Sequence, residues 1–246
     1  MDPTLPIRAA RPWNPLLAFG LALGVCAAAS LAAHRLPASV TTRYPWSSQA
    51  VQQGLMTLVA LVAMRASGRR LAEFGFRRPE PATGRFVLWG LVLGMTSAGI
   101  MMGLGLTGMR ARLATYGLPG MVLWIWLVSS VVEEIFVRGW FQSLVAGAAE
   151  DDPRGERARA AVFWSAALFG TMHLFLLFGG VGIATVAVIV PSVTALGLVC
   201  ATARARTGSL RPAIAAHVAF NVGGFVAGVI YGIAYRVTTG QLPPAL

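Results

Sequence analysis

The residues of this sequence that could carry out chemistry inside an apolar environment are concentrated in three segments, SSVVEEIFVRGW, ALFGTMHLF and AIAAHVAFN. They comprise two adjacent carboxylates, an arginine, two histidines and a carboxamide: Glu133, Glu134, Arg138, His173, His217 and Asn221. A carboxylate and an imidazole can polarise a water molecule for attack on a carbonyl. A second imidazole and a carboxamide can stabilise the oxyanion that develops. The same donors could instead hold a divalent metal ion. Both arrangements predict hydrolysis of an amide bond.

Helical spacing assigns different surroundings to the two glutamates. Glu134 and Arg138 are four residues apart, so they share a helix face and can form an ion pair. Glu133 is rotated about 100° from its neighbour and is available to another helix or to water. His217 and Asn221 are also four residues apart. Each of these helices is therefore expected to present one polar stripe.

The cost of placing these groups in a membrane predicts that they meet. A charged side chain at the centre of a membrane helix costs about 2.5–3.5 kcal/mol. Each flanking leucine, isoleucine or valine returns only about 0.3–0.6 kcal/mol. The charges of Glu133, Glu134 and Arg138 therefore need partners or water. We expect the polar stripes to converge in one catalytic cavity within the membrane.

The composition requires membrane-spanning helices. Of 246 residues, 56% are hydrophobic and only 12% are charged, and the mean hydropathy is +0.68. Such values are far outside the range of soluble domains, and uncharged runs of about 20 residues indicate membrane spans. We predict an all-α fold, a polytopic transmembrane helix bundle of seven or eight spans. Seven are expected near residues 15–33, 48–64, 86–108, 121–146, 160–178, 181–203 and 212–235.

The arginines predict an orientation. Fourteen of them fall in the N-terminal segment and in loops that alternation places on the same side, five fall on the opposite side, and Arg138 is in a span. Cytoplasmic loops carry the excess of basic residues. The N-terminus is therefore expected in the cytoplasm. The first span resembles a signal peptide, but we expect it to be retained. Segment 73–81, EFGFRRPEP, is either an interfacial element or a solvated loop.

The choice of arginine over lysine indicates a bacterial origin, and the positions of the arginines argue against nucleic acid as a partner. All twenty basic residues are arginine, and alanine, glycine and proline are abundant, which indicates a GC-rich genome. We expect an integral protein of a bacterial inner (cytoplasmic) membrane. The net charge of +11 lies mainly in short loops between apolar runs, where arginines contact lipid headgroups. We therefore expect the lipid bilayer as a partner and no nucleic acid.

Three motifs in these segments resemble a known family. EEIFVR fits EExxxR, FGTMH fits FxxxH and HVAFN fits HxxxN, in that order. Together they resemble the CPBP intramembrane proteases, which include the type II CAAX prenyl endopeptidases, bacterial Abi-like proteins and the sorting enzymes called myxosortases. The resemblance covers about residues 121–225. We accordingly divide the chain into residues 1–120, with N-terminal spans and the arginine-rich loop, and residues 121–246, the catalytic core.

The resemblance implies a role for each residue of the motifs. Glu133 would activate water together with His173, while His217 and Asn221 would line the oxyanion site. Glu134 and Arg138 would support the site. We favour a glutamate-type mechanism without a cofactor, since no HExxH motif is present. The alternative is a divalent metal such as zinc, held by Glu133, His173 and His217.

The expected function is cleavage of a membrane protein or a lipid-anchored peptide, including C-terminal processing or sorting of exported proteins. Two readings without catalysis remain open. Intramembrane acids and histidines also form proton relays in transporters, and a bundle can bind a partner helix as a scaffold or immunity protein without cleaving it. A transporter usually has repeat symmetry with polar groups in both halves. Here the intramembrane charges lie in one half, which favours the enzyme.

Overall fold

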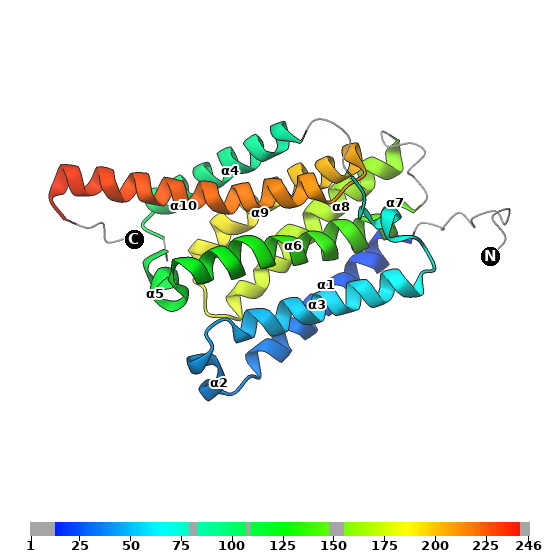
Figure 1. The fold of residues 1–246 in the computed structure, drawn as a ribbon, viewed down its shortest axis with the longest axis horizontal. Coiled ribbons are helices and arrows are strands. Elements are labelled where there is room, and N and C mark those ends of the chain that lie inside the picture. Colours follow the sequence, from blue (N-terminus) through cyan, green and yellow to red (C-terminus); the bar gives the residue numbers. More distant parts are fainter. Residues whose placement is uncertain (1–12, 79–82, 107–108, 148–154, 242–246) are drawn as a thin grey trace.

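The structure, a computed structural model, describes residues 13–78, 83–106, 109–147 and 155–241 as one helical bundle (Figure 1). Every element assigned in these residues is helical. The α-helices are α1 (Pro15–His34), α2 (Ala38–Arg43), α3 (Ser47–Ala66), α4 (Gly84–Gly103), α5 (Met109–Gly120), α6 (Ser129–Glu134), α7 (Gln142–Ala146), α8 (Glu156–Met172), α9 (Ile183–Thr207) and α10 (Arg211–Thr239). The other elements of the described residues are two 3₁₀ segments, η1 (Leu71–Phe74) and η5 (His173–Leu177), and two π-helical segments, η2 (Met121–Val128) and η3 (Ile135–Phe141).

The bundle has the composition of a membrane protein. Six helical runs in the described residues are long and apolar enough to cross a membrane. Large apolar side chains such as Ile183 and Val237, 78% and 80% exposed, cover its outside. Helix α3 corresponds to the span predicted near residues 48–64, and it is the one predicted span that is not among these six. It has 20 residues but contains three glutamines, which lower its hydropathy. The predicted all-helical membrane bundle is confirmed, with six spans that meet the length and hydropathy limits instead of seven.

Successive long helices run in opposite directions, so the connections between them lie alternately at the two ends of the bundle (Figure 1). Helix α1 begins at the end opposite to the one where α10 ends (Figure 1). The segment around η1 lies beside the turn between α9 and α10, because the Leu210 amide donates to the Gly75 carbonyl at 2.9 Å. The Trp13 amide donates to the Leu144 carbonyl at the same end. We call this the arginine-rich end, since it also carries Arg65, Arg69, Arg70, Arg77, Arg204, Arg206 and Arg211.

Residues 73–78, the described part of segment 73–81, are anchored to the bundle and form neither a free interfacial element nor a simple solvated loop. Phe74 is fully buried among the helices, whereas Phe76 is exposed. Backbone and side-chain hydrogen bonds tie the segment to the α9–α10 turn, including one from Ser209 Oγ to the Arg77 carbonyl at 2.7 Å. Residues 79–82 lie outside the described part of the chain. The segment therefore closes the arginine-rich end.

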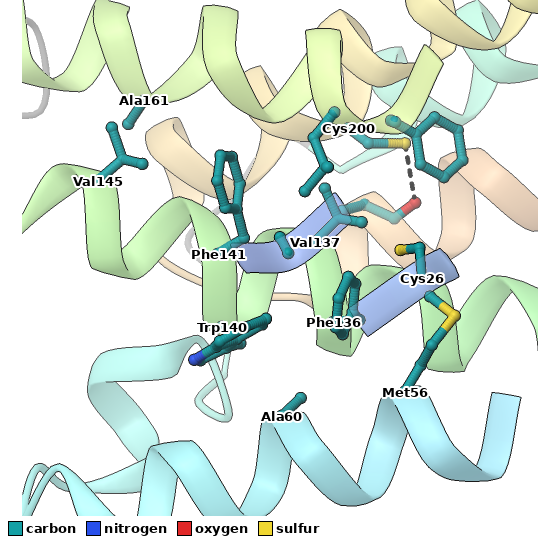
Figure 2. Packing of buried hydrophobic residues seen from close by; sticks show 14 of the residues in the cluster. Cys26, Met56, Ala60, Phe136, Val137, Trp140, Phe141, Val145, Ala161 and Cys200 are labelled. Atoms are coloured by element: carbon teal, nitrogen blue, oxygen red, sulfur yellow. Dashed lines mark hydrogen bonds between the residues drawn. The ribbon is translucent and has the colours of Figure 1, made fainter. Parts of the chain in front are cut away.

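The run from η2 to α7 is the central helix of the bundle. Gly117, with a φ of 63°, separates it from the first part of α5. Its side chains pack in two directions (Figure 2): Phe136 and Trp140 face Ala60 of α3, while Phe141 and Val145 face α8. Helix α1 contributes Ala22, Cys26 and Ala29 to the same core. The central helix is thus held on both sides, which fixes the polar residues that it carries.

Helices α4 and α10 form the most extensive helix pair of the described bundle. Two glycines of α4 lie against the backbone of α10. A Cβ atom on Gly90 would lie 2.1 Å from the Ala216 carbonyl oxygen, and one on Gly94 would lie 2.0 Å from the Phe220 carbonyl oxygen. Small residues let membrane helices approach this closely. The contact fixes the position of α10 along its axis at the turns that carry His217 and Asn221.

Candidate active site

A buried ion pair lies at the centre of the site. Arg138 Nη1 donates to Glu134 Oε1 at 3.0 Å, and both side chains are 0% exposed. Arg138 Nη2 donates to the Gly197 carbonyl of α9 at 3.0 Å. The guanidinium carbon lies 4.4 Å above the ring centroid of Phe169 on α8, a cation–π contact. Arg138 therefore ties the central helix to α8 and α9, as the sequence predicted for a supporting residue.

The second histidine joins this pair from α10. His217 Nδ1 lies 3.1 Å from Glu134 Oε1, within hydrogen-bonding distance. A carboxylate only accepts hydrogen bonds, so this contact assigns the Nδ1 proton to His217. The other ring nitrogen, Nε2, then has a free lone pair in the neutral imidazole. It lies 3.9 Å from Oε2 of Glu133.

His173, the first histidine in the sequence, contacts the ring of Phe169, which also contacts His217. His173 begins η5, where α8 ends, and its Nδ1 donates to the Phe169 carbonyl at 2.7 Å. The ring of Phe169 is in edge contact with both histidines, with centroid distances of 5.0 Å to His173 and 5.4 Å to His217. His173 also interacts electrostatically with Glu133. The Nδ1 contact leaves Nε2 of His173 available as an acceptor.

Glu133 is held by a chain of hydrogen bonds that begins on α3. Gln53 Nε2 donates to Ser129 Oγ at 2.7 Å, and Ser129 Oγ donates to Glu133 Oε1 at 2.7 Å. The second carboxylate oxygen, Oε2, faces His217. The Glu133 side chain is 13% exposed, in contrast to that of Glu134. The two adjacent carboxylates thus occupy different surroundings, as the helical spacing predicts.

Asn221 is positioned between α10 and the central helix. Its Nδ2 donates to Ser130 Oγ at 3.1 Å and to the Ile125 carbonyl at 3.4 Å. These contacts use both amide hydrogens within the bundle. In this arrangement Asn221 joins two helices, so a role at an oxyanion requires these hydrogens to be redirected. That role stays a prediction.

The structure brings the six predicted residues together around Phe169 and the central helix. Four elements supply them: α6, η3, the α8–η5 junction and α10. A carboxylate and an imidazole with a free Nε2 atom can activate water, and an imidazole that is protonated at Nε2 can donate to a developing negative charge. The site is tightly packed, and a cavity that admits a peptide stays a prediction.

The donor set does not have the arrangement of a metal centre. Within the described residues, no group of three His, Cys, Asp or Glu side chains lies close enough together to hold a metal ion. Glu133, His173 and His217 therefore do not fit a zinc ion as they are placed.

Sequence reasoning missed three members of the site. Gln53 and Ser129 orient Glu133, and Ser130 is bound by Asn221. A signal for the serines was present, because Ser129 precedes Glu133 by four residues in the same helix. Gln53 lies on α3, 76 residues before Ser129 in the sequence. No local pattern links it to the motifs.

The comparison with protein families supports the motif reading. Residues 115–223 match the family model described as type II CAAX prenyl endopeptidase Rce1-like. The matched region contains all three motifs and confirms the predicted resemblance to the CPBP intramembrane proteases. Together with the six apolar helices, the match supports an integral membrane protein, and the matched family suggests intramembrane protease activity of the CAAX type. No curated protein and no solved structure matches the chain significantly.

Proposed function

We propose that this protein is an intramembrane endopeptidase that hydrolyses a peptide bond with a water molecule activated by Glu133 and histidine. The observation that carries the proposal is the relation between Glu133 and His217. Glu133 Oε2 and His217 Nε2 are 3.9 Å apart and both can accept a hydrogen bond. One water molecule can donate to both atoms across this separation. Glu134 holds His217 in the required tautomer.

The proposed reaction needs only groups of this chain, water and the substrate. The water oxygen attacks the carbonyl carbon of the scissile bond while Glu133 accepts a proton. The carbonyl oxygen gains negative charge, and the C–O bond forms as the carbonyl π-bond opens. Glu133 then delivers the proton to the amide nitrogen, and the C–N bond breaks to release a carboxylic acid and an amine. General acid–base transfer of this kind contributes about 10²–10⁴-fold to a rate.

The histidines and Asn221 complete the proposed machinery. The family resemblance assigns His173 as the partner of Glu133, and the 3.9 Å contact supports His217 in the same task. The imidazole that does not bind the water would donate to the oxyanion in its protonated form, because its Nδ1 proton is already used by the Phe169 carbonyl or by Glu134. Asn221 would assist it once its amide hydrogens are released from Ser130 and Ile125. Glu134 and Arg138 position these groups and do not touch the substrate.

The substrate class follows from the surroundings of the site. A site enclosed by membrane-spanning helices receives a peptide that reaches it from the bilayer, such as a membrane protein or a lipid-anchored chain. We propose C-terminal processing or sorting of exported proteins in a bacterial inner membrane. The arginine-rich end would face the cytoplasm, together with the N-terminus. Thiol labelling of single cysteines placed at Arg206 and Arg236 tests this orientation, since only the cysteine at position 236 should react from outside intact cells.

Terminal-peptide proteomics tests the proteolysis. Cells with the wild-type protein are compared with cells that carry Glu133→Gln, which keeps the shape of the side chain and removes the base. Glu156→Gln, the same change at an exposed position of α8, is the matched control. Termini of membrane or surface proteins that change only with Glu133→Gln would support the proposal and identify the substrate. Unchanged termini, with folded protein at equal levels, would refute it and favour a scaffold.

A further inference from the structure

A charged cavity of about 170 Å³ opens at the arginine-rich end, away from the proposed active site. Residues of the η1 segment, α7, α8 and the end of α9 line it. Its charged lining residues are Arg69, Glu73, Arg77, Arg204 and Arg206. None of the six predicted active-site residues belongs to this lining. Ligand pockets for larger molecules measure about 300–1,000 Å³, so this cavity suits a small anionic group.

The described lining of the cavity has a surplus of positive charge. Glu73, the one acidic residue in this described lining, is paired with Arg69 at 2.9 Å. Arg77 and Arg204 donate to backbone carbonyls, of Gly208 and Glu73 respectively, at 2.8 Å each. The Gly208 carbonyl fixes the guanidinium of Arg77 in place without neutralising its charge. Within the described lining, Arg77 and Arg206 therefore add positive charge beyond the Arg69–Glu73 pair, which favours an anion.

Another lining residue points to a ligand that also carries a hydrogen-bond donor. Gln142 is 5% exposed, and its Nε2 donates to the Ala201 carbonyl. Its Oε1 has no hydrogen-bond partner within the described residues. A buried acceptor without a partner lowers the stability of the folded protein. A headgroup with a hydroxyl or an ammonium group next to its phosphate would supply the missing donor.

A second, mainly apolar cavity of about 510 Å³ adjoins the first. The two linings share Arg69 and Gly147. The apolar one lies between α1, α3 and the central helix and is lined by Trp13, Leu21, Ala63, Phe74, Trp140 and Leu144. The guanidinium of Arg69 lies 4.8 Å above the ring of Phe74, at the junction. Charge on one side and apolar surface on the other match an anionic amphiphile.

We propose that these two cavities form a binding site for one anionic phospholipid of the bilayer. The phosphate lies among Arg69, Arg77, Arg204 and Arg206, and one acyl chain occupies the apolar cavity. Basic pockets between membrane helices bind lipid headgroups in this way. The site lies apart from the proposed active site, and the proposal does not depend on proteolysis. A bound lipid would link the η1 segment, α3, α7 and α9.

Lipid titration of the purified full-length protein in detergent tests the proposal. The thermal midpoint is measured against phosphatidylglycerol, phosphatidylcholine and inorganic phosphate, and bound lipid is identified by native mass spectrometry. We expect phosphatidylglycerol to raise the midpoint and to be retained, and the other two to do neither. Equal effects of both lipids would overturn the charge selection. An equal effect of inorganic phosphate would assign the site to a soluble anion, and no effect of any probe would overturn the proposal.

Variants separate the two parts of the site. Arg77→Gln with Arg206→Gln removes two exposed cations and should weaken phosphatidylglycerol binding about 25-fold, at about fivefold for each arginine. Arg236→Gln, an exposed arginine at the opposite end of the bundle, is the control and should change nothing. Ala66→Phe, at an exposed position that lines the apolar cavity, should abolish lipid retention. Retention by both variants at the wild-type level would contradict the site.

Discussion

Glu134 Oε1 lies 3.1 Å from Nδ1 of His217, so a residue of the central helix orients a histidine carried by α10. The same oxygen accepts a hydrogen bond from Arg138. One carboxylate atom therefore serves both the packing of the bundle and the tautomer of a proposed catalytic histidine. Stability and activity are coupled at this atom.

Replacing Glu134 with glutamine should lower stability and activity together. Breaking a buried ion pair at one partner costs about 3–5 kcal/mol, because the other charge is left uncompensated. Arg138 would be that charge, because the glutamine amide keeps an acceptor oxygen for Arg138 and His217 but carries no negative charge. The thermal midpoint in detergent and the protein level in membranes measure the first effect. A stable but inactive Glu134→Gln protein would show that Glu134 acts in the chemistry itself.

Replacing Ser129 with alanine should reduce activity and leave the fold intact. Ser129 donates to Glu133 Oε1, and hydrogen bonds to charged groups contribute about 1.5–3 kcal/mol. We expect a loss of turnover of about tenfold to a hundredfold. Gln53→Leu, which removes the donor to Ser129, should reduce turnover less. Thr57→Ala, another hydroxyl of α3 that bonds only its own helix, is the control, and an equal loss in that variant would contradict the assignment.

Two glycines of α4 should respond in opposite ways to the same change. Gly94→Ala places a Cβ atom against the Phe220 carbonyl and forces α4 away from α10. Overpacking of this kind costs about 1–3 kcal/mol. Gly99 on the same helix has open space, so Gly99→Ala should gain helix propensity of up to about 1 kcal/mol. The thermal midpoints of the two variants test this prediction. Equal midpoints would show that the close contact between α4 and α10 is not required.

Glu73 should make the arginine-rich end sensitive to acid. Its partial burial raises the pKa, but hydrogen bonds from Arg69 and from the Arg70 amide, together with the two positive charges, outweigh this and hold the pKa of Glu73 below 4.5. A lowered pKa in the folded state adds stability above the unfolded value, and this stability is lost as pH falls through the folded pKa. The midpoint difference between wild type and Glu73→Gln should therefore shrink as pH falls from 7 to below 4.5. A difference that does not change with pH would contradict the ion pair.

Chelation should leave activity unchanged under the proposed glutamate-type mechanism. Purified protein treated with EDTA or phenanthroline should retain its turnover, while Glu133→Gln abolishes it at every metal concentration. Loss of activity on chelation, restored by zinc, would assign the chemistry to a metal. It would also require Glu133, His173 and His217 to rearrange, because they do not form a metal-binding group in the structure.

The sequence predicted those parts of the site that local spacing determines. The pairing of Glu134 with Arg138 follows from helix geometry, and the energetic cost of buried charge required His217 to come close. The sequence could not predict which glutamate His217 binds, because that depends on the axial position of α10. That position is set by Gly90 and Gly94 against α10, and glycines in an apolar span give no sign of their partner. Gln53 lowers the hydropathy of α3, which was nevertheless predicted as a span near residues 48–64, and the same residue orients Glu133 through Ser129.

The glycine contact between α4 and α10 also divides the perimeter of the bundle. Along that flank the two backbones approach so closely that even a methyl group on Gly90 or Gly94 has no space. A polypeptide diffusing in the plane of the bilayer cannot pass between them. The flank formed by α4 and α10 is therefore closed to the proposed membrane-embedded substrate. Such a substrate would have to enter between other helices of the bundle.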